Sequence, residues 1–141
     1  MDLENARQSI ESALLRMRAL YLKPVFDEWM ILDPAAKHGG VLAYVGPRVE
    51  SFRPNLSTDV APLRAMMEGR ELNPGDFEFA QDAAGPRHDA IVKIGPKSFL
   101  VCNNTAKTMA ELRADPQWLK AQAAFFELTE KFRADPLQSV N

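Results

Sequence analysis

DAIVKIGPKSFLVCN, residues 89–103, is the stretch that decides the fold. Its first half alternates, with the even-numbered residues of Ala90–Ile94 on one side and Ile91 and Lys93 on the other, which is the period of a strand. Gly95-Pro96-Lys97 is a turn signal, and Ser98–Asn103 returns with a run that is apolar on both sides. The stretch therefore predicts a β-hairpin whose second strand lies inside a sheet.

Upstream of the hairpin, the chain opens with a helical pattern. Apolar residues from Asp2 to about Leu22 recur at spacings of three and four, and Pro24 ends or kinks that helix. Val25–Leu32 follows as a short, very apolar piece before Asp33-Pro34. We expect residues 1–33 to form an N-terminal helical region.

The middle of the chain predicts three further strands and one helix. Val41–Val45 does not alternate, which is typical of a central strand covered on both faces. Arg48–Arg53 has charged ends and is followed by proline, which indicates an edge strand that pairs with it. The helix begins near Ser57 and runs to Glu68, and Asp76–Gln81 alternates as a second edge strand.

The C-terminal part predicts a helical region over residues 105–135. Thr108 and Glu111 have the spacing of a capping box, and Asp115-Pro116 restarts the helix. The predicted order is α-β-β-α-β-β-β-α in one α+β domain of residues 1–141, with a five-stranded antiparallel sheet within residues 39–103 and helices packed on it.

Composition restricts the class of protein. The 141 residues are 46% apolar and 26% charged with a net charge of −2, as in an ordinary globular domain. No stretch concentrates basic residues, so we expect no nucleic-acid binding. No signal peptide and no apolar run of membrane length is visible, and a lone Cys102 favours a reducing compartment, so we expect no membrane association and a cytoplasmic protein.

The element order resembles that of the Roadblock/dynein-light-chain family, whose fold is close to the profilin and longin folds. The resemblance rests on Gly40–Val45, on a helix near Val60–Glu68, and on the pair Ala90–Ile94 and Phe99–Cys102. It implies a five-stranded antiparallel sheet, a homodimer, and a role as a scaffold or regulator, often of small Ras-like GTPases. PAS and GAF domains have related sheets with a different element order and rank second.

A search for catalytic chemistry finds little. His38 and His88 stand far apart in the sequence without a metal-binding spacing, and Cys102 lies in an apolar strand where a thiol is usually buried and unreactive. The carboxylates Asp76, Glu78, Asp82 and Asp89 are interpreted as a solvated sheet edge. We expect no catalytic site, no metal and no cofactor.

The aromatic residues are more informative. We expect core packing to account for most of them, but two helices beside a small sheet would not ordinarily hide them all. The candidate interface residues are Phe77, Phe79, Trp29, Trp118, Phe125 and Phe126. Our leading hypothesis is a non-enzymatic, homodimeric interaction or regulatory module that binds itself, with a small GTPase or another protein as a further candidate partner. The alternative is a small-ligand sensor of the PAS or GAF type, in which the sheet and the segments carrying Trp29 or Trp118 enclose a pocket.

Overall fold

The computed structural model describes residues 1–33, 40–50, 67, 71–80 and 88–138. Its strands are β1 (Glu28–Leu32), β2 (Val41–Val45), β3 (Phe77–Phe79), β4 (Ala90–Lys93) and β5 (Phe99–Asn103). They form one antiparallel sheet in the order β2-β1-β5-β4-β3. The helices are α1 (Leu3–Tyr21), α3 (Met109–Ala114) and α4 (Trp118–Ala134). The expected α+β class and five-stranded antiparallel sheet are confirmed.

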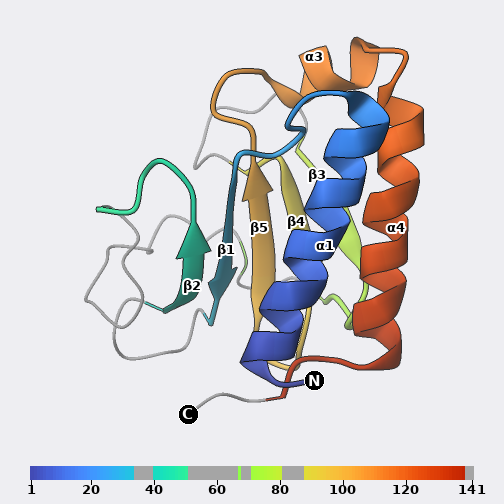
Figure 1. Ribbon diagram of the computed structural model, residues 1–141. Coiled ribbons are helices and arrows are strands. Elements are labelled where there is room, and N and C mark those ends of the chain that lie inside the picture. Colours follow the sequence, from blue (N-terminus) through green and yellow to red (C-terminus); the bar gives the residue numbers. More distant parts are fainter. Residues whose placement is uncertain (34–39, 51–66, 68–70, 81–87, 139–141) are drawn as a thin grey trace.

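Helices α1 and α4 pack side by side on one face of the sheet, and α3 lies at one end of it (Figure 1). Alternation sends Trp29, Ile31, Val92 and Leu100 to this helix face, where they join the main core. The intervening strand residues form a second core on the opposite face, with Met67, described as helical, packed among them. The sheet is therefore covered on both faces.

The hairpin prediction is confirmed. β4 and β5 pair with Ala90 opposite Cys102 and Lys93 opposite Phe99, and β5 lies between β4 and β1. All five residues of β5 are buried. The predicted capping box at Thr108 and Glu111 is also present, at the start of α3.

Three expectations about the first half of the sheet are wrong. Residues 28–32 are not helical but form β1, a fully buried strand between β2 and β5, so the N-terminal helical region ends at Tyr21. β2 pairs with β1 and lies at one edge of the sheet, not in its centre. Residues 47–50 form a turn instead of the first part of an edge strand, while residues 51–53 lie outside the described residues, as do nearly all those of the helix predicted at 57–68.

The C-terminal region is two helices rather than one. The chain bends at Asp115-Pro116, where the Asp115 carboxylate accepts a hydrogen bond from the Gln117 amide at 2.9 Å. Tyr21 at the end of α1 donates to the same carboxylate at 3.0 Å. This bend lets α4 turn back along the sheet beside α1, with β3 at its other side.

Candidate functional site

Two features could carry function: a buried polar network at one end of the sheet, and an aromatic cluster at the β3 edge. The network begins with Glu28, the first residue of β1, whose side chain is 0% exposed. Register places Glu28 opposite Asn103 at the end of β5, and Asp89 precedes β4 one strand further along. Antiparallel pairing thus aligns three polar side chains from three neighbouring strands on the face that carries Met67.

Glu28 accepts hydrogen bonds on both carboxylate oxygens. Tyr44 of β2 donates through its hydroxyl at 2.5 Å, and Asn103 Nδ2 donates at 2.8 Å. Arg48 donates twice, from Nε at 2.8 Å and from Nη2 at 2.5 Å. The carboxylate is therefore surrounded by four donors, two of them from one guanidinium in the bidentate geometry that suits this pair.

These contacts set the protonation of the group. Burial acts to raise the pKa of Glu28, but the hydrogen bonds from Arg48, Asn103 and Tyr44 outweigh it and lower the pKa below its ordinary value. Burial, together with the bond to Glu28, raises the pKa of Tyr44 to about 12. Near neutral pH, Glu28 is ionised and Tyr44 is protonated. A carboxylate already holding four donors is poorly placed to accept a proton from a substrate.

The network continues across the sheet end through amide contacts. Asp89 accepts from the backbone of Asn104 at 2.5 Å, and the Asn103 side-chain oxygen accepts from the Asp89 amide at 3.1 Å. Asn104 donates from its side chain to the Val25 carbonyl at 2.9 Å. These bonds fix the connections that enter β1 and leave β5, which is a structural role.

Sequence analysis missed this network almost entirely. Asp89 was assigned to a solvated edge but is 4% exposed, and Glu28 was assigned to a helical piece. The pairing of Glu28 with Asn103 depends on the strand register, which no local pattern supplies. The sequence offered one signal, because Glu28 directly precedes an apolar run. A charge beside a buried run is almost never buried without a partner, so this position indicates a buried polar contact.

The remaining catalytic candidates from the sequence are Cys102, His88 and His38. Cys102 is buried within β5, and burial, aided by the charge of Asp89, raises the pKa of its thiol. His88 is half-buried just before β4, while His38 lies outside the described residues. No group of three or more His, Cys, Asp or Glu side chains in the described ranges could hold a metal ion.

The aromatic cluster lies between α4 and the edge strand β3. Phe77 and Phe79 on β3 contact each other with ring centroids 5.3 Å apart. Phe77 also contacts Phe125 at 5.4 Å and Phe126 at 5.3 Å, and Phe79 contacts Trp118 at 5.5 Å. The contacts run continuously from the core to the surface, and they fix β3 against α4.

The six candidate interface residues divide by exposure. Trp29, Trp118 and Phe125 are buried in the core of the single chain, so their rings are not available at its surface. Phe77 and Phe79 are half-buried, and Phe126 is 40% exposed. On α4, Leu119 is 74% exposed and Ala123 is also exposed, in line with Phe126 at spacings of four and three residues. We call Phe77, Phe79, Leu119, Ala123 and Phe126 the β3–α4 patch.

The backbone beside this patch belongs to β3, the last strand in the order of the sheet. In the part of the chain that the structure describes, β3 has β4 as its only strand neighbour. The Asp76 carbonyl accepts a hydrogen bond from the Lys93 amide, and the Ala80 amide donates one to the Asp89 carbonyl, at 2.9 Å each. The alternation of an antiparallel ladder then turns the backbone groups of Phe77 and Phe79 outward.

Charged groups border the β3–α4 patch at both ends. The Arg113 guanidinium lies over the Phe79 ring, 5.7 Å from its centroid. At the opposite end, Arg133 donates to the Gly75 carbonyl at 3.1 Å and pairs with Glu130. An apolar centre with a charged rim is the usual composition of a protein interface.

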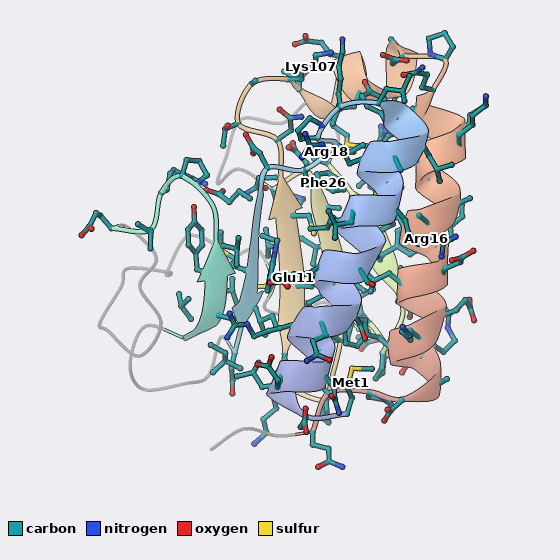
Figure 2. All side chains as sticks on the ribbon, viewed as in Figure 1. Met1, Glu11, Arg16, Arg18, Phe26 and Lys107 are labelled. Carbon is teal, nitrogen blue, oxygen red and sulfur yellow. The ribbon has the colours of Figure 1, made fainter. Side chains whose placement is uncertain are left out.

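Two further surface features lie along the boundary between α1 and α4, outside the β3–α4 patch. A groove of about 420 Å³ lies between the first turns of α1 and the end of α4, and its walls are polar, including Ser9, Ser12 and Lys131. Further along the same helix boundary, Arg16 of α1 pairs with Glu127 of α4, and Figure 2 shows Arg16 on that side of α1. The sensor hypothesis places its pocket beside Trp29 or Trp118, and neither residue lines this groove.

No family model, curated protein or solved structure matches the chain. Among the described residues, no helix combines the length and the apolar character needed to cross a membrane.

Proposed function

We propose that the chain is a non-enzymatic protein-interaction module that binds through the β3–α4 patch. The observation that carries the proposal is the exposure of Leu119 and Phe126 beside β3, a strand with a single strand neighbour among the described residues. Exposed leucine and phenylalanine in one stripe are costly in water, and such patches commonly mark binding surfaces. An outward-facing strand edge adds backbone donors and acceptors for a partner segment.

The buried polar network supports the same proposal by its chemistry. Its carboxylate holds four donors, its tyrosine is protonated near neutral pH, and the nearby Cys102 thiol is buried with a raised pKa. Such groups stabilise a scaffold and are poor nucleophiles or bases. The reactive residues that ordinary hydrolytic catalysis requires are thus not provided by this network.

The finer proposal is a homodimeric, Roadblock-like regulator of a small Ras-like GTPase in the cytoplasm. It is supported by the element types and by the arrangement of α1 and α4 on one sheet face with helical Met67 on the other. Binding of purified Ras-like GTPases, loaded with GDP or GTP, to the immobilised chain tests this part. If no GTPase in a broad panel binds the chain, in either the GDP-loaded or the GTP-loaded state, this part of the proposal is contradicted.

The experiment for the interaction surface compares two substitutions of equal chemistry. Phe126→Glu places a charge in the β3–α4 patch, while Leu15→Glu places one on α1, where Leu15 is 66% exposed. The tagged chain is used to isolate partners, each partner is identified by mass spectrometry, and binding is then measured with purified components. We expect Phe126→Glu to weaken binding at least tenfold and Leu15→Glu to leave it unchanged. Equal effects of the two substitutions would contradict the proposal.

A further inference from the structure

The outer edge of β3 carries backbone groups that can pair with an added strand. Asp76 and Ala80 make backbone hydrogen bonds toward the β4 side of the strand. In an antiparallel ladder the residues between such bonding positions alternate, so Phe77 and Phe79 direct their own N–H and C=O groups away from β4. These two residues therefore present two donors and two acceptors along the outer edge.

A positive charge lies at the Phe79 end of this edge. The Arg113 guanidinium is exposed and lies 5.7 Å from the centroid of the Phe79 ring. Among the residues that the structure describes, no carboxylate forms an ion pair with Arg113. An acidic side chain placed beside Phe79 would thus meet a cation that the aromatic ring already holds in position.

The charge at the Phe77 end has the opposite sign. Arg133 donates to the carbonyl of Gly75, just before β3, and pairs with both Asp76 and Glu130, at 3.7 Å in the case of Asp76. One guanidinium faces two carboxylates there, which leaves a surplus negative charge. The edge is therefore polar along its length and favours an added strand with an acidic group near Phe79 and a basic group beyond Phe77.

We propose that the β3 edge binds an extended segment of a partner protein whose alternate residues are acidic, apolar and basic, in that order from its N-terminus. The segment pairs antiparallel with β3, as do all strand pairs in the described sheet. Its acidic residue then lies opposite Phe79, and its apolar residue lies opposite Phe77 and near Phe126, whose ring contacts Phe77. This inference rests on the proposed interaction function and names the chemistry of its partner.

A bound strand also suits the small apolar area of the β3–α4 patch. Leu119 and Phe126 are its most exposed large side chains, and two side chains supply much less than the roughly 800 Å² that each partner buries in a standard interface. In strand addition, main-chain hydrogen bonds supply the affinity and alternate side chains supply the specificity. Backbone bonds to Phe77 and Phe79 therefore compensate for the limited apolar contact, and the complex is weak.

The probe is the synthetic peptide acetyl-Thr-Glu-Thr-Val-Thr-Lys-Thr-amide, titrated into the ¹⁵N-labelled full chain. Its glutamate and valine take the positions opposite Phe79 and Phe77. We expect saturable shifts of the β3 amides and of the Arg113 Nε–H, with a Kd in the millimolar range. Shifts confined to other elements, or none up to several millimolar peptide, would overturn the proposal.

Two N-methylated peptides test the backbone pairing. In the proposed register the valine N–H donates to the Phe77 carbonyl, whereas the N–H of the threonine before it points away from β3. Methylation of the valine nitrogen should weaken binding about tenfold, because one hydrogen bond is lost and the methyl group collides with the strand. Methylation of that threonine nitrogen should leave the affinity unchanged. Equal effects of the two methyl groups would show that the peptide does not add as this strand.

Exchange of the peptide glutamate and lysine tests the polarity of the edge. In the same register the exchanged peptide places its lysine beside Arg113, so we expect it to bind about fivefold more weakly. Equal or tighter binding would contradict the assigned direction.

A charge reversal in the protein completes this test. Arg113→Glu should reverse the preference between the two peptides. The matched control is Lys120→Glu, two helical turns before Glu127 and thus on the side of α4 nearest to α1, and it should keep the wild-type preference. Circular dichroism checks that both variants are folded, and the peptide comparisons with wild type decide the matter if Arg113→Glu is not. A folded Arg113→Glu that keeps the wild-type preference would refute the role of Arg113.

This inference and the proposed function fail in different ways. If the peptide does not bind but Phe126→Glu abolishes binding of another purified protein, the strand inference falls and the interaction function stands with a folded surface as the occupant. If neither peptide binding nor partner binding responds to Phe126→Glu, the β3–α4 patch is not the binding surface and both proposals fall.

Discussion

Replacing Glu28 by glutamine should strongly destabilise the protein, because Glu28 joins β1 to β2, to β5 and to the turn at Arg48. The substitution keeps the side-chain volume but removes the charge that all four donors address. One of the two former oxygens becomes an NH₂ group, which faces donors instead of accepting from them. The buried site then holds unmatched donors in place of a satisfied carboxylate.

The magnitude follows from burial. Removing one member of a fully buried ion pair costs about 3–5 kcal/mol. Here Glu28 is 0% exposed but the Arg48 side chain is 43% exposed, so the released guanidinium can be hydrated. We therefore expect a loss of about 2–3 kcal/mol in the free energy of unfolding, toward the lower end of what a buried pair and its charged hydrogen bonds supply.

Urea denaturation followed by circular dichroism measures this loss. The matched control is Glu127→Gln, which removes a charge from an ion pair whose side chains are both 59% exposed. An exposed pair contributes at most about 1 kcal/mol, so the control should shift the midpoint little. If Glu28→Gln costs no more than Glu127→Gln, with unchanged m-values, the network is not the stabilising element described above.

Four further outcomes are expected. The stability difference between wild type and Glu28→Gln should be full above pH 4.5 and should shrink as the pH falls further, because the folded-state pKa of Glu28 lies below its ordinary value of 4.5. Urea titrations at pH 7, 4 and 3 measure this difference. A difference that stays constant over these pH values would contradict the prediction. Leu22→Gly should raise the free energy of unfolding by about 0.5–1 kcal/mol, because Leu22 has φ 65° at the end of α1, a conformation that costs a leucine but not a glycine; a lower melting temperature would show that the leucine side chain matters more. Gly75→Ala should destabilise by at least about 1–3 kcal/mol, since Gly75 has φ +91° and an added Cβ would lie 2.8 Å from the Thr129 carbonyl oxygen; wild-type stability in urea would contradict it. Cys102 should react with a thiol reagent in native protein only as fast as the protein unfolds, and a fast native reaction would disprove its burial.

The sequence predicted the elements whose pattern is local. The β4–β5 hairpin followed from alternation around Gly95-Pro96-Lys97, and the capping box at Thr108 followed from residue spacing. The strand Glu28–Leu32 was missed because a run apolar on every side is compatible with a buried helix segment and with a central strand. Its neighbour Val41–Val45 was misplaced for a related reason: an apolar run does not indicate which strand it pairs with, and in the fold it lies at an edge.

The candidate site likewise combines features that local sequence patterns predicted with features that they did not. The apolar stripe of α4 through Leu119, Ala123 and Phe126 is visible as helical spacing, although which members stay exposed depends on where α1 and β3 lie. Trp29 was assigned to surplus helix surface because its segment was assigned to a helix, whereas in β1 it joins the core. The Glu28 network depends on strand register over 75 residues of chain, which no short pattern encodes.

A dilution series of ¹⁵N-labelled protein, observed through its backbone amide shifts, tests the central claim most directly. If the proposed homodimer forms through the β3–α4 patch, the amides whose shifts change with concentration will lie in β3 and along Leu119–Glu130. Amides around Leu15 on the outer side of α1 will not move. Concentration-dependent shifts confined to α1, or none up to several hundred micromolar, would contradict the account.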